Sequence, residues 1–266
     1  MNVSIMGAGA FGTALGKILI DNGHAVSYYD PKHSALSMDE ATHEAEVIVI
    51  AVPSGVMMDF CRDYPANLME LPTILATKGL TDAGLFGAFE NFSVLSGPAF
   101  AKEIIAGDTT LLTATDSIAR MLFENEQVAI ELTDDLRGVL LCGALKNVYA
   151  IGAGYQEPSE NAMAAFLTQA YREMRQYLSD HDASAGTAEL ACGIGDLILT
   201  CTSETSRNFL CGKMLRDGMV TDEICQKLDT VEGISALESL DRQNYPLLSE
   251  VHALVKKQPN RKFRQL

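Results

Sequence analysis

The sequence predicts an α/β fold in which an N-terminal doubly wound parallel sheet is followed by a C-terminal all-helical domain. In residues 1–133, short apolar segments rich in Val, Ile and Leu alternate with helical patterns, and this alternation is typical of a parallel sheet. From Asp134 onward the strand patterns disappear and long helical patterns replace them. We therefore place the domain boundary between 133 and 134, which gives domains of residues 1–133 and 134–266.

The strands of the first domain are predicted from short apolar runs that glycine, proline or polar residues terminate. The run Val47 to Val52 is continuously apolar and rich in β-branched residues, as expected of a parallel strand buried on both faces. The other expected strands are Asn2 to Met6, Ala25 to Tyr29, Thr73 to Ala76, Ser93 to Leu95, Thr109 to Thr115 and Val128 to Leu132.

Helices are predicted where apolar residues recur at helical spacing. A helix from Ala10 to Asn22 stops before Gly23, a common helix terminator. The polar stretch Ser37 to Glu46 predicts a short solvated helix. The long helices of the second domain are expected at Leu136 to about Ala153, with Asp134 or Asp135 as its cap, and at Ser159 to about Ser179.

Composition and charge narrow the functional classes. The formal net charge is −15, which disfavours binding to nucleic acids or to anionic membrane surfaces, because both need a basic face. No apolar run approaches the roughly 20 residues that span a bilayer, and the N-terminus lacks the features of a secretory signal. The six cysteines show no C-x-x-C spacing and the five histidines are scattered. We therefore expect a cytoplasmic protein without a metal site.

A glycine motif follows the first predicted strand and opens the first predicted helix. Its residues are Gly7, Gly9 and Gly12, spaced as G-x-G-x-x-G. Gly7 permits the tight turn, Gly9 lets the backbone approach a pyrophosphate, and Gly12 lets the helix and strand pack closely. The free N–H groups at the start of the helix can then hold the phosphates. This context predicts a Rossmann-like dinucleotide-binding domain.

Asp30 ends the second predicted strand, about 20 residues after the glycine motif, where a carboxylate can accept hydrogen bonds from the adenosine ribose. A carboxylate at this position favours NAD, because it would repel the 2′-phosphate of NADP. Lys32 and His33 follow directly and could instead serve a 2′-phosphate. The expected cofactor is therefore NAD or NADP, with NAD slightly favoured.

Two segments of the second domain carry groups suited to carbonyl and phosphate chemistry. Lys146 lies within an apolar, small-residue helix, where an ammonium is costly to bury unless it is paired. Asp196 supplies a carboxylate, and Arg207 and Asn208 follow after a short loop. An ammonium beside a ketone stabilises the negative charge that a hydride develops on the oxygen, and then delivers a proton. A guanidinium binds phosphate in a bidentate manner, through two parallel N–H donors.

Motifs along nearly the whole chain resemble those of the NAD(P)-dependent glycerol-3-phosphate dehydrogenases. The lysine helix and the segment from Asp196 to Asn208 are the most specific of them. The matching segments are Gly7 to Gly12, Ala51 to Ser54, Ala76 to Leu80, Ser96 to Glu103, Gly143 to Gly152, Gly195 to Cys201, Ser206 to Asn208 and Val231 to Gly233.

The resemblance implies roles for individual residues of these segments. Lys146 is the acid/base group at the C2 oxygen, and Asp196 beside it sets its charge and orients the substrate. Ser206, Arg207 and Asn208 are implied to bind the phosphate, and Arg207 also borders the cofactor. Lys78 lies between cofactor and substrate, and the Gly97 backbone faces the substrate. The remaining residues implied to line the cofactor are Ala10, Phe11, Ala101 and Glu232.

The resemblance thus implies an oxidoreductase that interconverts dihydroxyacetone phosphate and sn-glycerol 3-phosphate with NAD(P)H and supplies glycerophospholipid synthesis. The implied partners are a small phosphorylated substrate and a second copy in a homodimer, and the charge and the lengths of the apolar runs predict no nucleic acid and no stable membrane insertion. Two alternatives stay open: a reductase of another small carbonyl acid, of the ketopantoate or 3-hydroxyacid type, and a homologue that binds dinucleotide without turnover. Ala99 stands where the family usually has Ser or Thr.

Overall fold

The computed structural model describes residues 1–32, 36–64, 68, 70–79, 92–156 and 159–256. These residues divide into two compact units. The first takes in Met1–Lys78 and Asp82–Val139. The second takes in Gly79–Thr81 and the chain from Leu140 onward, so the division falls inside the long helix α6 (Leu136–Tyr155). A functional division at 133–134 stays a prediction.

The first unit contains a seven-stranded sheet with the strand order β2-β1-β3-β4-β5-β6-β7. From β1 the chain first adds β2 on one side and then continues with β3 on the other side. This change of direction is the doubly wound arrangement that the sequence predicts. Strand bounds match the predicted runs closely. The strands are β1 (Asn2–Met6), β2 (Ala25–Tyr29), β3 (Val47–Ile50), β4 (Thr73–Leu75), β5 (Phe92–Ser96), β6 (Thr110–Ala114) and β7 (Val128–Leu132).

The predicted doubly wound, mostly parallel sheet is confirmed, with one exception in the pairing of β5 with β6. These two strands are antiparallel, with Leu95 opposite Ala114, whereas every other neighbouring pair is parallel. The connection between them holds the six-residue helix α4 (Ala101–Ala106), which spans about 9 Å. A five-residue strand is about 17 Å long, so α4 does not carry the chain back to the far end of the sheet, and β6 starts where β5 ends.

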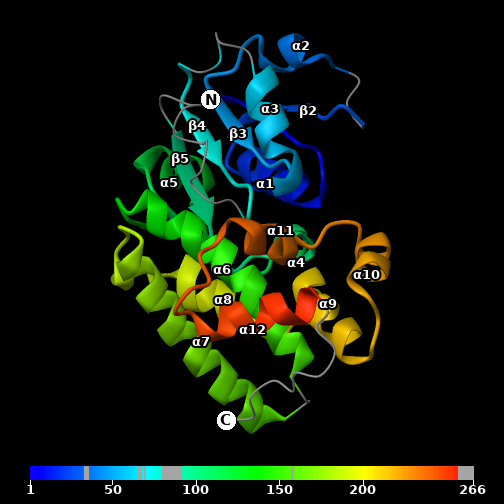
Figure 1. Cartoon of the computed structure of the whole chain (residues 1–266). Coiled ribbons are helices and arrows are strands. Elements are labelled where there is room, and N and C mark those ends of the chain that lie inside the picture. The colour runs from blue at the N-terminus through cyan, green and yellow to red at the C-terminus, as the bar shows by residue number, and fades with distance from the viewer. Residues whose placement is uncertain (33–35, 65–67, 69, 80–91, 157–158, 257–266) are drawn as a thin grey trace. The chain divides into compact units, whose positions relative to one another are not determined.

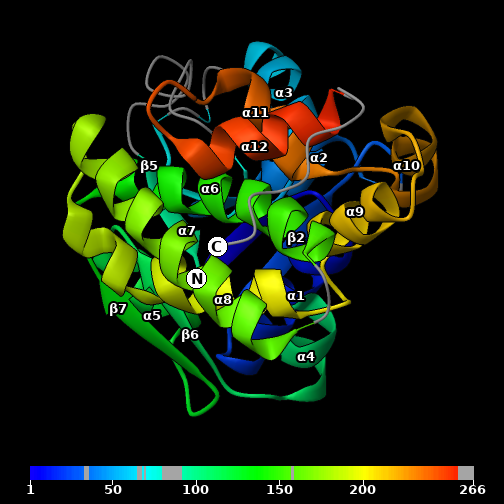
Figure 2. The same ribbon diagram turned by 60° about the horizontal axis from the view of Figure 1, so that its bottom comes forward.

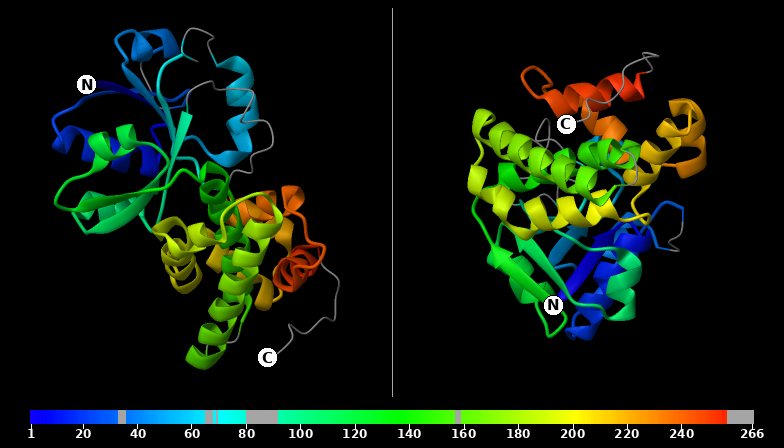
Figure 3. Two further views of the ribbon diagram at one scale, coloured as in Figure 1. Left: turned by 90° about the vertical axis from the view of Figure 1, so that its left-hand side faces the viewer. Right: turned by 90° about the horizontal axis from the view of Figure 1, so that it is seen from below.

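Helices cover both faces of this sheet (Figure 1 and Figure 3, left). Buried residues of α1, α4 and α5 form one apolar cluster with the sheet, including Leu15, Ile104 and Leu122. The blue helix α1 lies on one side and the cyan helix α3 on the other. The helices of this unit are α1 (Ala10–Asp21), α2 (Met38–Thr42), the 3-10 helix η1 (Ser54–Val56), α3 (Met57–Asp63), α4 and α5 (Ser117–Phe123).

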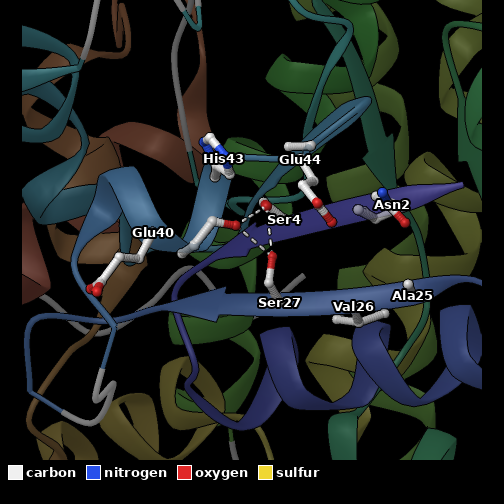
Figure 4. A pocket seen from close by; sticks show the side chains of 11 residues that line it. Asn2, Ser4, Ala25, Val26, Ser27, Glu40, His43 and Glu44 are labelled. Atoms are coloured by element: carbon white, nitrogen blue, oxygen red, sulfur yellow. Dashed lines mark hydrogen bonds between the residues drawn. The ribbon is translucent and has the colours of Figure 1, made fainter.

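Two serine side chains attach α2 to the sheet (Figure 4). Ser4 and Ser27 are opposite each other in β1 and β2. Their hydroxyls lie 2.7 Å apart and contact the carbonyl oxygen of Ala41 at 2.5 and 2.6 Å. The helix is shorter than the predicted 37–46. It starts after Ser37, which forms a capping box with Glu40.

The described part of the second unit is helical and contains no strand. Beyond the two long helices that the sequence predicts, it consists of short helices joined by tight turns. Asp135 caps α6 by accepting a hydrogen bond from the Gly138 N–H at 2.9 Å. The other helices are α7 (Glu160–Asp180), the 3-10 helix η3 (Ala185–Glu189), the π-helix η4 (Ala191–Gly195), α8 (Asp196–Thr202), α9 (Arg207–Arg216), α10 (Thr221–Leu228), α11 (Glu232–Ser239) and α12 (Pro246–Val255).

Helix α6 forms the core of the second unit (Figures 1 and 2). It is long and apolar enough to cross a membrane by length and composition, but 89% of its most apolar window is buried inside the protein. At Gly152 an added Cβ would lie 2.9 Å from Phe166 of α7 and 3.0 Å from Val251 of α12. The apolar character of α6 is therefore explained by the helices that surround it.

Candidate functional site

The turn between β1 and α1 has the shape that the glycine motif predicts. Gly7 has φ of +107°, and a Cβ there would lie 2.8 Å from the Ala51 carbonyl oxygen. At Gly12 a Cβ would lie 1.9 Å from the Gly7 carbonyl oxygen. At Gly9, by contrast, no atom of the described residues beyond its chain neighbours lies within 4 Å of the Cβ position. The backbone at Gly9 therefore faces open space into which a ligand can approach.

The first turn of α1 presents backbone N–H groups without a side-chain cap. Gly9 is its N-cap residue, and no acidic residue lies in the first turn. Asp30 accepts a hydrogen bond from the Ala8 N–H through Oδ2 and from the Lys32 N–H through Oδ1, both at 2.9 Å. The carboxylate therefore lies directly beside the glycine turn, and each oxygen keeps lone-pair capacity for a hydroxyl. His33, the other residue suggested for a 2′-phosphate, lies outside the described residues.

These features fit a dinucleotide, because they combine an open backbone turn, an uncapped helix start and an acidic group at the end of β2. The residues Ala10 and Phe11 form the beginning of α1, and Ala101 begins α4. A pyrophosphate and an adenosine ribose are thus the chemical groups that this turn of the first unit can bind.

Lys78 places a positive charge in the same unit. Its Nζ donates hydrogen bonds to the carbonyl oxygens of Gly97 at 3.1 Å and Ala99 at 3.4 Å. It also lies 5.1 Å from the ring centroid of Phe11, within the range of a cation–π interaction. The structure therefore brings together three residues, Lys78, Gly97 and Phe11, that the sequence suggested separately.

In the second unit, Lys146 and Asp196 form a buried ion pair. The Nζ and Oδ2 atoms lie 2.7 Å apart, and the side chains are 3% and 1% exposed. Thr200 completes the group, since its Oγ1 accepts a hydrogen bond from Lys146 at 3.3 Å and donates one to Asp196 Oδ1 at 3.1 Å. The ammonium is thus paired, as a buried charge requires, and it retains N–H capacity for one more oxygen.

Thr200 was not among the residues that sequence reasoning selected for the site. Its position four residues after Asp196 places both on one face of α8, and this spacing was the available signal. The preceding π-helix η4 sets the start of α8. A Cβ at Gly193 would lie 2.3 Å from the Ala188 carbonyl oxygen, so the chain enters α8 through a turn that a larger residue would obstruct.

Burial raises the pKa of the neighbouring Cys201 thiol, although the charge of Lys146 acts in the opposite direction. A thiol held in its protonated form is a poor nucleophile. Among the described residues, no group of three His, Cys, Asp or Glu side chains could hold a metal ion. The chemistry of this site therefore centres on the amine of Lys146 and the carboxylate of Asp196.

The predicted phosphate-binding residues lie at the start of α9. Ser206 is buried and caps the helix, accepting a hydrogen bond from the Phe209 N–H at 3.3 Å. Arg207 is exposed, and its guanidinium has no ion-pair partner within the described ranges. Arg207 is therefore available to an anion. Asn208 is buried, and its side chain is hydrogen-bonded to the protein through both polar atoms.

Asn208 and Glu232 are connected through Asn147, a residue that the sequence analysis did not assign to the site. Asn208 Nδ2 donates to Asn147 Oδ1 at 2.9 Å, and Asn147 Nδ2 donates to Glu232 Oε2 at 3.0 Å. Asn147 directly follows Lys146 in α6 and is 2% exposed. The sequence around Asn147 carries no local signal of this contact.

Comparisons with known proteins identify the family to which the chain is similar. The family model described as the NAD-dependent glycerol-3-phosphate dehydrogenase N-terminus matches residues 2–37 and 33–121, and that of the C-terminus matches 135–262. A glycerol-3-phosphate dehydrogenase [NAD(P)+] of Listeria monocytogenes is 33% identical over 288 aligned positions, which cover 90% of this chain and 85% of the relative. The corresponding protein of Legionella pneumophila is 29% identical over 95% of this chain and 92% of its own.

Solved structures give the same result. A crystal structure of glycerol-3-phosphate dehydrogenase from Coxiella burnetii superposes with a TM-score of 0.84 at 25% identity, covering 96% of this chain and 94% of the other. The yeast glycerol-3-phosphate dehydrogenase has a TM-score of 0.78 at 19% identity, covering 97% of this chain and 96% of its own, and this likeness bears on the fold alone.

Proposed function

Because the chain belongs to the NAD-dependent glycerol-3-phosphate dehydrogenase family, we propose that it interconverts dihydroxyacetone phosphate and sn-glycerol 3-phosphate. The observation that carries this proposal is the buried group of Lys146, Asp196 and Thr200. It offers a paired ammonium with remaining N–H capacity, which is what the oxygen of a ketone undergoing reduction needs.

The nicotinamide, when bound, supplies the hydride. Lys146 donates a hydrogen bond to the C2 oxygen of the substrate and then transfers a proton to it as negative charge develops there. In the opposite direction the neutral amine accepts that proton. Asp196 holds the ammonium by its charge, and Thr200 fixes the geometry, because its single hydroxyl proton is donated to Asp196. Thr200 is thus a positioning residue.

The phosphate of the substrate is assigned to the start of α9. Arg207 supplies an exposed guanidinium that forms no ion pair with the described residues, and such a group binds phosphate through two parallel N–H donors. Asn208 and Ser206 complete this site, the first through its side-chain amide and the second at the cap of the helix. Fixing the phosphate fixes the carbon skeleton, so the C2 oxygen is held for Lys146.

The dinucleotide is assigned to the glycine turn of the first unit. Gly7, Gly9 and Gly12 shape the turn for the pyrophosphate, and Asp30 accepts hydrogen bonds from the ribose. This carboxylate favours NAD over NADP, because a 2′-phosphate beside it would be repelled. Lys78 and the Gly97 backbone are assigned to the substrate, and Lys78 also to the cofactor. The remaining contacts to the cofactor are assigned to Ala10, Phe11, Ala101, Arg207 and Glu232.

In the cell we propose that the protein acts in the cytoplasm, binds neither nucleic acid nor membrane stably, and forms a homodimer. Its product would supply glycerophospholipid synthesis. The net charge of −15 supports the absence of nucleic-acid binding, and the burial of α6 inside the protein supports the absence of stable membrane binding.

The proposal is tested by following NADH oxidation with dihydroxyacetone phosphate. We expect turnover by the wild-type protein and its loss in Lys146→Ala by roughly 100-fold or more, while NADH binding persists. Lys146→Arg keeps the charge and the ion pair but is a poor proton donor, so it separates loss of chemistry from loss of folding. Turnover only with a non-phosphorylated keto acid, or dinucleotide binding without any turnover, would refute the proposed reaction.

A further inference from the structure

Three side chains and one backbone N–H form a closed ring of hydrogen bonds in the second unit. The Gly233 N–H donates to Asn208 Oδ1 at 2.9 Å. Asn208 then donates to Asn147, and Asn147 donates to Glu232, at 2.9 and 3.0 Å. Since Glu232 and Gly233 are consecutive residues at the start of α11, the ring begins and ends at the same point of the chain and links α6, α9 and α11.

The direction of every hydrogen bond in this ring is fixed by its two ends. A backbone N–H only donates, so Asn208 must turn its oxygen toward Gly233. An ionised carboxylate only accepts, so Asn147 must turn its amino group toward Glu232. The middle bond, from Asn208 Nδ2 to Asn147 Oδ1, then follows without an alternative. The ring therefore selects one orientation for both amide groups.

Close packing buries the two amide groups of the ring, whereas Glu232 is half-buried. Asn147 is 2% exposed and Asn208 is 7% exposed. A Cβ at Gly233 would lie 2.5 Å from the Asn147 carbonyl oxygen, so only glycine allows α11 to approach α6 this closely. The two hydrogen bonds of Asn208 are buried, and water cannot replace such bonds when one partner is lost.

We propose that Asn147 is a positioning residue that holds Asn208 in the orientation needed for the substrate phosphate. This inference rests on the proposed function of the α9 site. In the ring, Asn208 uses its oxygen and one of its two Nδ2 hydrogens, and the second hydrogen is left for an anion. Without Asn147 the amide of Asn208 loses the acceptor that keeps this hydrogen in place. The same residue holds the Glu232 carboxylate, which we assign to the cofactor.

The test reverses one bond of the ring. In Asn147→Asp the side chain still accepts from Asn208, but its second oxygen meets the Glu232 carboxylate and repels it. In Glu232→Gln the acceptor is retained as an amide oxygen, so the ring is kept. In the double variant Asn147→Asp/Glu232→Gln, the glutamine can donate to the aspartate, and the ring closes again with its last bond reversed.

The measurement is the dissociation constant of glycerol 3-phosphate by calorimetry, with the NADH-saturated protein. We expect Asn147→Asp to weaken binding roughly ten-fold or more, as the loss of a charge-assisted, part-buried contact implies. Addition of Glu232→Gln should recover most of that loss. Asn161→Asp is the matched control, because Asn161 is exposed in the first turn of α7; it should bind as the wild type does.

A packing role alone would not produce this rescue, because Asn and Asp have almost the same shape. Wild-type affinity in Asn147→Asp, or losses that add in the double variant, would overturn the proposal. Failure of the proposed function would show differently, as absence of turnover and of glycerol 3-phosphate binding in the wild type. In that case the existence of the ring is tested by the free energies of unfolding of the wild type, Asn147→Asp, Glu232→Gln and the double variant. Recovery in the double variant of the stability that Asn147→Asp loses supports the ring, and absence of recovery overturns it.

Discussion

Gly212 of α9 lies directly on the backbone of Ile151 in α6. A Cβ at Gly212 would be only 2.0 Å from the Ile151 carbonyl oxygen, and a Cβ at Gly154 would be 2.0 Å from the Phe209 carbonyl oxygen. The two helices therefore cross through a pair of glycines, one on each helix. This crossing brings the start of α9 close to α6 and so places Asn208 within hydrogen-bonding distance of Asn147.

Gly212→Ala is expected to destabilise the protein by about 2 kcal/mol or more, because the new methyl group meets backbone atoms that cannot move aside cheaply. Urea unfolding measures this loss. Gly55→Ala is the matched control, since no atom lies within 4 Å of its Cβ position, and we expect a change of less than about 1 kcal/mol. Equal stability of the Gly212→Ala and wild-type proteins would show that α6 and α9 do not pack as described.

Lys146→Met is expected to cost about 3–5 kcal/mol of stability, because it leaves the Asp196 carboxylate buried without its counter-charge. Asp196 is 1% exposed, so solvent cannot compensate. The double variant Lys146→Met/Asp196→Asn removes the charge as well and should recover most of the loss. Thermal and urea unfolding at pH 7 compare the two. If the single variant were as stable as the wild type, the ion pair would not be formed in solution.

Arg207→Ala is expected to weaken the binding of glycerol 3-phosphate far more than that of NADH, by roughly 100-fold for the phosphate compound. Arg207 is exposed, so the variant should fold normally. Titration of each ligand separately gives the two dissociation constants. Equal losses for both ligands would contradict the assignment of this guanidinium to the phosphate, and Arg207→Lys should retain part of the affinity through its charge alone.

Asp30→Asn is expected to shift the preference from NADH toward NADPH by roughly ten-fold, since the charge that repels a 2′-phosphate is removed. The ratio of the two dissociation constants is the measured quantity. Asp39→Asn, which changes the same charge on an exposed residue of α2, serves as the control and should leave the ratio unchanged. An unchanged ratio in Asp30→Asn would assign the preference to another residue.

The parts of this molecule that follow local patterns could be predicted from the sequence. The continuous apolar run at 47–52 and the glycine turn at 7–12 each depend on neighbouring residues, and the structure places β3 and the start of α1 there. The antiparallel entry of β6 could not be predicted in this way, because it depends on how far α4 carries the chain. The apolar pattern of each strand from Thr73 to Leu132 predicts a strand but not its direction in the sheet.

The site shows the same difference between local and long-range information. Lys146 and Asp196 were recognisable because each lies in a distinctive segment. The contact of Asn147 with residues 61 and 85 positions later in the sequence leaves no local signal, and Asn147 reads as an ordinary polar residue of an apolar helix. Amide orientation and ring closure are properties of the packed helices alone.

Glu173 gives a prediction about pH. Its carboxylate joins α7 to the start of α12, accepting hydrogen bonds from the Leu247 and Leu248 N–H groups at 2.8 and 3.0 Å and contacting the Tyr149 hydroxyl at 3.3 Å. Burial raises the pKa of Glu173 above its usual value of 4.5, although these hydrogen bonds act to lower it. The folded protein therefore holds the proton of this group more tightly than the unfolded chain does.

A raised pKa in the folded state means that the contribution of Glu173 to stability is complete below the unfolded value and is lost as the pH rises through the folded value. We therefore expect the free energy of unfolding of the wild type, relative to Glu173→Gln, to fall between about pH 4.5 and neutrality. Urea unfolding of both proteins across this range measures the difference. A difference that grows as the pH rises would mean that the two N–H donors outweigh burial, because the charged carboxylate would then be the better partner for α12.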